Sequence, residues 1–231
     1  MCFSVEVLPD ISLLSTQLGS SLNQAEYNRF AAQHSLKPKD YKWTGTDQRL
    51  FPKVFSWVLT KESFTPMRYQ LLPHFCDENK YTRINPDTGR KNEIKNTFNA
   101  RLDSLAKRKA WQGLFMKNHA VLPLTRFYEW VPGHDRKPKL ISFHSSENEI
   151  LYAPCLYDHW TSLDGEESFY SFAIITDSPP EEALRTGHDR CPAFINESQI
   201  KNWLNPQGQS VQSIYQILQE KQDDYFLNQW A

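Results

Sequence analysis

Short runs of branched and aromatic residues recur along the chain and most constrain its fold. They lie at 53–59, 120–124, 126–131, 139–144, 150–158 and 169–176. Such residues favour strands, and Pro132-Gly133 gives a turn signal between two of the runs. We therefore expect an antiparallel β core.

Helical spacing is found mainly at the periphery of this pattern. Ser21 begins a capping-box sequence, so a helix is predicted over 21–35. Further helices are predicted over 103–117 and 178–187, and through apolar residues 211–218 near the C-terminus. Strands in the centre with helices at the edge predict an α+β fold. We expect the whole chain, 1–231, to form one domain.

Positive charge is concentrated in one part of the sequence. Residues 80–109 hold nine basic and three acidic side chains, whereas the whole chain has a net charge of −1. Residues 76–98 overlap the first part of this stretch. They are mostly polar and predict a long exposed loop. Such an asymmetry is typical of a phosphate-binding surface, and an ordinary solvated face is the alternative.

Cysteine and apolar patterns exclude several classes of protein. Cys2, Cys76, Cys155 and Cys191 are far apart and form no C-x-x-C pair, so we expect no metal and no cofactor. No apolar run approaches the ~20 residues of a membrane span. The start of the chain does not resemble a signal peptide. We expect a cytoplasmic monomer with free thiols.

Cys2 directly follows the initiator methionine. Removal of Met1 would leave an α-amine and a thiol on adjacent carbons, with pKa values near ~8 and ~8.5. The amine can condense with an aldehyde, and the thiol can then attack the imine carbon to close a thiazolidine ring. The alternative is an incidental small residue at position 2.

Two further motifs carry polar groups suited to chemistry. In FNAR (98–101), Asn99 can donate and accept hydrogen bonds and Arg101 offers a fork for phosphate. A helix cap is the alternative for Asn99. In FYEW (127–130), Glu129 stands among aromatics, where burial would raise its pKa unless it has a partner. Exposure on the outer strand face is its alternative.

The motif GHDRCP (187–192) places a histidine two residues before an arginine. His188 is a natural acid or base at neutral pH, and Arg190 could hold a phosphate. Tyr69 and Phe75 could stack on unpaired bases, with core packing as the alternative.

These motifs, in this order, resemble the SOS-response-associated peptidase (SRAP) family, whose members are described as abasic-site processing proteins. The likeness rests on Met1-Cys2, N-A-R, F-x-E-W and H-x-R-x-P, and on PMRYQLLPHF at 66–75. It spans nearly the whole chain. The resemblance implies a curved, barrel-like, mainly antiparallel β core with peripheral helices and a basic groove.

The resemblance also implies roles for individual residues. Cys2 would be the nucleophile, exposed when the protein removes its own Met1, and would crosslink to abasic sites in single-stranded DNA. Asn99 would position the reacting groups, Glu129 would assist proton transfer, and His188 would open the sugar ring. Residues expected to bind DNA are Arg68, Tyr69, Phe75, Arg101 and Arg190.

The sequence departs from the family pattern in several places. Cys-Gly-Arg is replaced by Cys2-Phe3-Ser4, Trp-Gly by Tyr69-Gln70, and a glutamate after N-A-R by Asp103. These changes affect the expected binding of DNA more than the expected reaction at Cys2.

Two other functions stay open from the sequence. One is a hydrolase or peptidase that uses Cys2 on other substrates. The other is a non-catalytic protein that only binds single-stranded DNA. Bound to DNA, the protein would be associated with the nucleoid.

Overall fold

The computed structural model describes residues 4–76, 78–79, 81–85, 87–132, 137–145, 149–187, 190–220 and 226–230. Met1, Cys2, Phe3 and His188 therefore lie outside the described residues. No helix among those described is both long and apolar enough to span a membrane.

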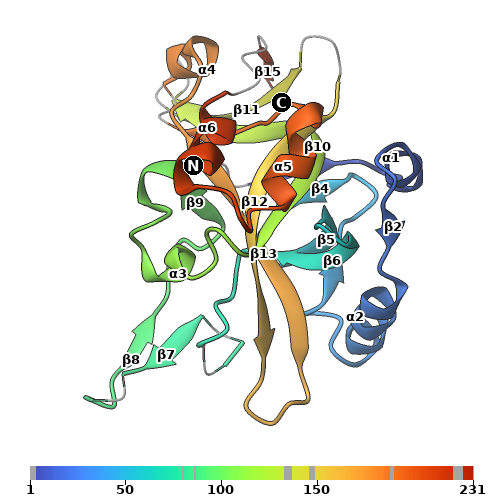
Figure 1. The fold of residues 1–231 in the computed structure, drawn as a ribbon, viewed down its shortest axis with the longest axis vertical. Helices are drawn as coiled ribbons and strands as arrows, with labels where there is room; N and C mark the ends of the chain where they lie inside the picture. Colours follow the sequence, from blue (N-terminus) through green and yellow to red (C-terminus); the bar gives the residue numbers. More distant parts are fainter. Residues whose placement is uncertain are drawn as a thin grey trace.

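Five strands close into a barrel at the centre of the molecule (Figure 1). They are β5 (Val54–Leu59), β6 (Ser63–Tyr69), β10 (His119–Pro132), β12 (Leu151–Thr161) and β13 (Ser168–Asp177). They pair in the order β10–β12–β13–β6–β5, and Val121 of β10 pairs with Leu59 of β5 to close the ring. β6 and β13 pair in parallel, and the remaining pairs are antiparallel. The predicted α+β fold with a curved, mainly antiparallel barrel is confirmed.

Alternate side chains of the strands fill the interior of the barrel. Ala120, Leu122 and Leu124 of β10 belong to the interior cluster, whereas Val121 between them belongs to a second cluster outside. Successive side chains of a strand point to opposite faces, so one strand supplies both cores. A strand covered on both faces reads as a continuous apolar run, which is why 120–124 is visible in the sequence.

The C-terminal half of β10 continues past the barrel and carries further strands. β1 (Ser4–Val7) pairs antiparallel with it and also with β4 (Arg49–Leu50). β11 (Pro138–Ser145) pairs with β10, and β15 (Phe226–Trp230) pairs with β11. In Figure 1 these last two strands lie at the upper end of the molecule. The runs predicted at 120–124 and 126–131 are thus parts of one bent strand.

Helices cover the outside of the barrel. The cluster outside the barrel contains apolar side chains from four helices: α1 (Ser12–Gln17), α3 (Lys109–Gln112), α5 (Ile200–Leu204) and α6 (Val211–Gln219). Figure 1 shows α5 and α6 lying across the front of the barrel. α6 buries Ile214 and Leu218, and the Ser210 side chain caps it by accepting from the backbone of Ser213. The predicted C-terminal helix is confirmed.

A separate aromatic cluster holds α2 (Gln24–Leu36) against the barrel wall. The Phe30 ring lies 4.9 Å from Phe55 and 5.0 Å from Trp43, which belongs to β3 (Lys42–Trp43). The helix predicted over 21–35 is therefore present, but its cap is Asn23. Ser21 instead begins β2 (Ser21–Leu22), which pairs with β6.

Three predicted elements differ from the structure. Residues 103–117 form no continuous helix, because the backbone of Arg108 is extended between η1 (Leu102–Ser104) and α3. The loop predicted over 76–98 contains a hairpin of β7 (Thr82–Ile84) and β8 (Lys91–Glu93). The helix predicted over 178–187 is shorter, α4 (Glu181–Arg185).

A buried histidine joins β10 to α5. The His119 ring stacks on Trp203 at 3.8 Å, and its Nδ1 lies 2.7 Å from the Trp203 carbonyl oxygen. Nε2 accepts a hydrogen bond from the backbone N–H of Met116. These contacts require a neutral ring, because Nε2 must carry a lone pair.

Acid is expected to destabilise the protein through His119. Burial lowers the pKa of this imidazole to about 4. A histidine in an unfolded chain titrates near ~6.5, so unfolding takes up a proton between these values. The stabilisation is complete above pH ~6.5 and falls by about 3 kcal/mol as the pH drops to ~4.

Urea unfolding at about pH 7 and about pH 4.5 measures this loss. His119→Gln should show a clearly smaller loss than the natural protein, whatever its stability at neutral pH. His34→Gln, which replaces an exposed histidine on α2 in the same way, is the matched control for the substitution itself. Equal acid sensitivity in the His119 variant and the natural protein would contradict the assignment.

Candidate active site

The start of the described chain lies beside the predicted catalytic carboxylate. In the β1–β10 pair, Ser4 lies opposite Tyr128 and Val5 opposite Phe127, so Glu129 follows the pairing directly. Glu129 is 1% exposed. Phe127 and Val131, two residues to either side, belong to the barrel's interior cluster, so strand alternation turns Glu129 to the same inner face.

Cys2 lies outside the described residues. In the sequence it precedes Ser4, the first described residue, by two positions. Ser4 itself is paired next to Glu129.

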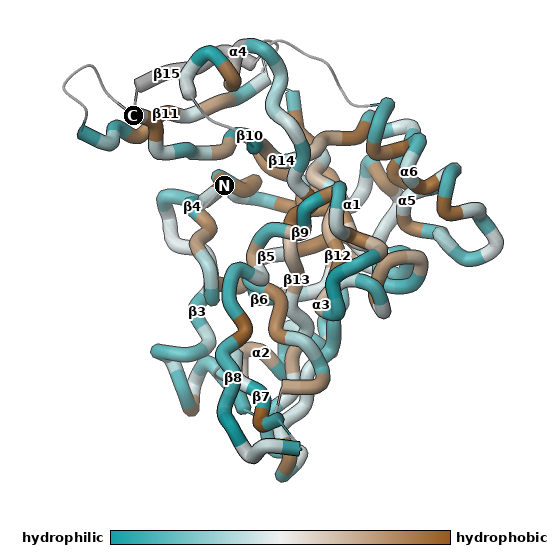
Figure 2. The backbone as a smooth tube through the Cα atoms, turned by 90° about the vertical axis from the view of Figure 1, so that its left-hand side faces the viewer, coloured by the Kyte–Doolittle hydropathy of each residue, from teal (hydrophilic) through white to brown (hydrophobic). Residues whose placement is uncertain are grey.

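The N-A-R motif forms a strand at the same end of the barrel. β9 (Asn99–Arg101) pairs in parallel with the end of β13, Asn99 opposite Ile174 and Arg101 opposite Thr176. β12 runs antiparallel to both β10 and β13, so the C-terminal ends of those two strands lie together. Figure 2 shows β9, β10 and β14 (Cys191–Pro192) in the upper part of the molecule.

Asn99 faces the barrel interior together with Glu129. Its partner Ile174 belongs to the interior cluster, and Asn99 itself is 3% exposed. The position of Asn99 inside a strand excludes the helix-cap alternative. The structure thus brings the buried amide and the buried carboxylate to one end of the barrel, each on its inner face.

Two arginines distant in sequence share one carboxylate at this end. Asp103 Oδ2 lies 2.7 Å from Arg101 Nη2 and 3.2 Å from Arg190 Nη2. Arg190 reaches this position because it precedes β14, which pairs with the end of β13. The hydrogen bond from Arg101, aided by the one from Arg190, lowers the pKa of Asp103. Guanidinium groups bind phosphate with the same geometry as carboxylate.

His188 also lies outside the described residues, two positions before Arg190. Arg190 itself is described, and it leads directly into β14.

Arg68 and Tyr69 are buried, away from any surface that DNA could reach. The Arg68 guanidinium hydrogen-bonds to Asn79 and lies 4.0 Å from the ring of Phe169. Tyr69 is fully buried in the barrel interior, with its ring stacked 5.3 Å from Phe172. Their predicted contacts with DNA are not supported by this arrangement. Both sit on the last residues of β6, where the barrel wall is covered on both faces.

The described residues contain no group of three or more His, Cys, Asp or Glu side chains suited to hold a metal ion. Cys76, Cys155 and Cys191 are buried free thiols. Burial raises the pKa of the Cys155 thiol, so it is unsuited to act as a nucleophile.

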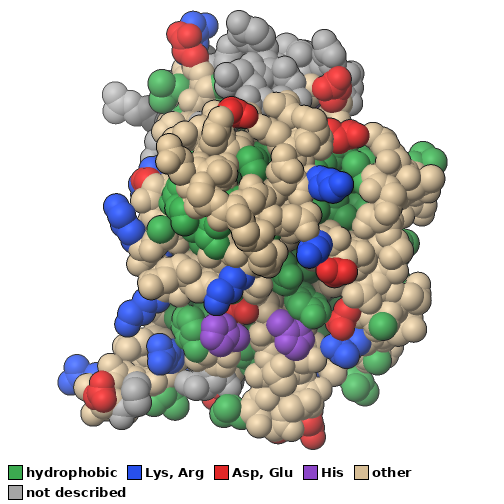
Figure 3. Space-filling model, in the orientation of Figure 1, with side chains coloured by type: hydrophobic (Ala, Val, Ile, Leu, Met, Phe, Trp, Pro, Cys, Tyr) green, Lys and Arg blue, Asp and Glu red, His purple; other side chains and the backbone are tan. Residues whose placement is uncertain are grey.

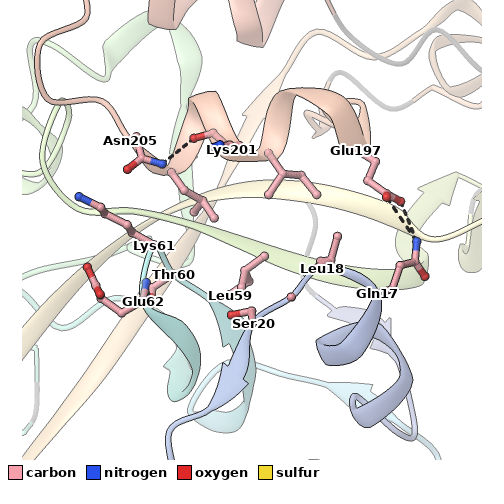
Figure 4. Close-up of a pocket in the computed structure, with 13 residues that line it drawn as sticks. Gln17, Leu18, Ser20, Leu59, Thr60, Lys61, Glu62, Glu197, Lys201 and Asn205 are labelled. Carbon is pink, nitrogen blue, oxygen red and sulfur yellow. Dashed lines mark hydrogen bonds between the residues drawn. The ribbon is translucent and has the colours of Figure 1, made fainter.

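A cavity of about 490 Å³ opens elsewhere, between the turn after α1 and the start of α5 (Figure 4). Apolar side chains such as Leu59 form its floor, and Gln17 bridges it by hydrogen-bonding to Glu197 of η2 (Glu197–Gln199) at 3.1 Å. None of the predicted site residues that the structure describes lines this cavity.

Comparison with known proteins supports the family resemblance that the sequence motifs indicated. A family model described as SOS response associated peptidase (SRAP) matches residues 1–229. The chain belongs to the SRAP family. One curated relative of this SRAP protein, named "Abasic site processing protein YoqW" in Bacillus subtilis (strain 168), is 29% identical over 124 residues, which are 53% of this chain and 54% of the relative.

A second relative of this SRAP protein is named "Abasic site processing protein HMCES" in Xenopus tropicalis. It is 27% identical over 158 residues, 60% of this chain and 44% of the relative. The matches thus span about half the length of these curated relatives.

Solved structures share the fold. A Bordetella bronchiseptica protein superposes with a TM-score of 0.71 at 14% identity, covering 100% of this chain and 99% of that one. A Bacteroides thetaiotaomicron protein gives 0.69 at 18% identity, with 94% and 86% covered. These similarities show that this SRAP protein shares its fold with both solved structures.

One residue of this SRAP protein that the motifs did not single out is Arg49. Its guanidinium donates to the Ser4 hydroxyl at 3.1 Å and lies 4.1 Å from the ring of Tyr128. The family pattern has arginine where this chain has Ser4. Arg49 on β4 therefore supplies a guanidinium beside that position, and the pairing of β1 with β4 holds it there. In the sequence, the only indication of this role for Arg49 was the absence of the family's arginine at position 4.

Proposed function

We propose that this protein processes abasic sites in single-stranded DNA by covalent capture through Cys2. The observation that carries the proposal is the pairing of β1 with β10, which sets Ser4, two residues after Cys2 in the sequence, next to buried Glu129. Relatives named as abasic site processing proteins support the same substrate.

The proposed reaction needs a free chain end. Hydrolysis of the peptide bond between Met1 and Cys2 releases the α-amine. The amine adds to the aldehyde of the open abasic sugar and loses water to give an imine. The Cys2 sulfur then bonds to the imine carbon while the thiol proton passes to the nitrogen, which closes a thiazolidine ring. No oxidant or reductant is required.

The neighbouring residues divide the remaining tasks. Glu129 transfers protons at the amine, during release of Met1 and during imine formation. His188 acts as acid and base on the sugar, because the aldehyde exists mainly as a closed hemiacetal. Asn99 orients the reacting groups. The buried setting of Asn99 and Glu129 supports these roles, since a site shielded from water strengthens polar interactions.

Arg101 and Arg190 are proposed to bind the phosphates that flank the lesion. Their shared carboxylate, Asp103, already holds the two guanidinium groups together. An incoming phosphate would replace Asp103 with little rearrangement, because both anions accept paired N–H donors.

A direct test is a capture assay with protein whose loss of Met1 has been verified by intact mass. Mixing it with a single-stranded oligonucleotide that carries one abasic site should give a conjugate that survives a denaturing gel, with at most one DNA per protein. The undamaged oligonucleotide should give none. Absence of the conjugate, with intact DNA, would overturn the proposal. Repeated turnover of peptides or amides would instead favour the hydrolase.

Asp103→Asn is expected to tighten binding of undamaged single-stranded DNA by about three- to tenfold at low salt, because it frees both arginines from a competing anion. Fluorescence anisotropy measures the affinity. Glu62→Gln removes an exposed carboxylate beside the cavity of Figure 4 and serves as the matched control. If both variants bind alike, Asp103 does not compete with DNA.

A further inference from the structure

A second cavity lies between the β7–β8 hairpin and α3, and neither Asn99 nor Glu129, the proposed catalytic residues that the structure describes, lines it. Its volume is about 310 Å³. Pockets for small ligands begin at about 300 Å³, so this one has room for about one nucleotide. It is built by the stretch from 75 to 111, which contains the basic part of the sequence.

The described residues that line the cavity carry only positive charge. They include Arg83, Lys95, Arg108 and Lys109 and no acidic side chain. Lys95 forms an exposed ion pair with Glu93 at 3.1 Å. The other three form no ion pair with any residue that the structure describes. Their charge is thus available to an anion.

Apolar and aromatic groups form the rest of the wall. Phe75, Ile94 and Trp111 line the cavity, and the Arg83 guanidinium carbon lies 5.2 Å from the centre of the Phe75 ring. Figure 3 shows hydrophobic side chains between the blue Lys and Arg groups on this side of the molecule. An aromatic face next to cations is the combination that binds a base and its phosphate.

The cavity adjoins the candidate active site along the chain. Thr97 lines the cavity, and Asn99 and Arg101 follow it on β9. The four peptide units from Thr97 to Arg101 span at most about 14 Å when extended. A DNA strand held by Arg101 and Arg190 is therefore within reach of the cavity.

We infer that this cavity is a subsite for one nucleotide flanking the lesion, with the base against Phe75 and the phosphate on Arg83 and Arg108. The inference rests on the proposed function, because it takes single-stranded DNA as the ligand. It adds a binding site that no proposed catalytic residue forms, built on a hairpin that the fold projects beyond the barrel (Figure 1).

The test is the affinity of the Met1-free protein for an undamaged, fluorescently labelled oligothymidylate over a series of salt concentrations. The double variant Arg83→Gln/Arg108→Gln should bind about tenfold more weakly. The plot of log K against log salt should also become less steep, its slope smaller in magnitude by about 1–2. Phe75→Ala should weaken binding about tenfold with an unchanged slope, because stacking releases no counterions.

The matched control is Lys61→Gln/Lys201→Gln, which removes the same charge from the cavity of Figure 4. This pair should bind like the natural protein. If the double variant at the proposed subsite binds like this control, the subsite is overturned. Should that variant fail to fold, judged by its thermal midpoint, Lys109→Gln replaces it, with an expected loss of about threefold and a slope lower by about 1.

The two proposals fail separately. If the natural protein does not capture abasic DNA, covalent capture is overturned, while the oligothymidylate series still measures the cavity. If capture succeeds and the cavity variants bind normally, the subsite alone is overturned.

Discussion

Cys2→Ala, still processed to a free chain end, is expected to form no conjugate with abasic DNA that survives heating in a denaturing gel. The variant keeps the α-amine, so an imine can still form, but an imine hydrolyses when no thiol closes the ring. Borohydride should therefore trap the DNA on this variant, whereas the natural protein should need no reductant. Denaturing gels with and without borohydride measure the difference.

The control for this prediction is protein that retains Met1, verified by mass. Its Cys2 nitrogen is an amide, so no thiazolidine ring can close and it should give no stable conjugate without borohydride. Its Met1 α-amine can still form an imine, so a conjugate seen only with borohydride agrees with the prediction. A stable conjugate formed by Cys2→Ala without reductant would place the nucleophile elsewhere in the chain.

Glu129→Gln is expected to slow capture by about 10²–10⁴-fold, the usual contribution of a positioned proton-transfer group. The amide has nearly the same shape as the buried carboxylate, so the barrel should still form. Single-turnover rates with excess protein measure the effect, and intact mass reports whether Met1 is still removed.

Glu6→Gln is the matched control for this change. Glu6 lies on β1 opposite Arg126, and its carboxylate accepts from the Tyr128 hydroxyl at 2.8 Å, on the strand face opposite Glu129. Its capture rate should stay within about threefold of the natural value, since it does not transfer a proton to the reacting groups. A normal rate in Glu129→Gln would remove Glu129 from the mechanism.

Local patterns predicted four of the five barrel strands, β5, β10, β12 and β13, because these are buried on both faces or alternate clearly. β6 was not predicted, because Pro66 and Arg68 interrupt its run of strand-forming residues. The β7–β8 hairpin escaped detection for a different reason. Lys91 to Glu93 are all exposed and polar, so no alternation marks them as a strand. The helix predicted over 103–117 fails at Arg108, where the extended backbone separates two short helical segments that tertiary packing of Leu105 and Trp111 holds in place.

The arrangement of the candidate site could not be predicted from the sequence. Asn99 could be assigned to a strand only once its pairing with Ile174 was known, because an asparagine before a helix-like pattern favours a cap. Tyr69 is buried because both faces of β6 are covered, and no short motif carries that information. The link between Arg101 and Arg190 through Asp103 joins segments far apart in the sequence.

The pairing of β1 with both β10 and β4 has a mechanical consequence for a captured DNA strand. DNA attached at Cys2 would be tethered two residues from an interior strand of the sheet. Hydrogen bonds between antiparallel strands lie perpendicular to the strand direction, so tension along β1 loads them all at once in shear. A molecular motor pulling on such a conjugate would meet the resistance of the whole sheet.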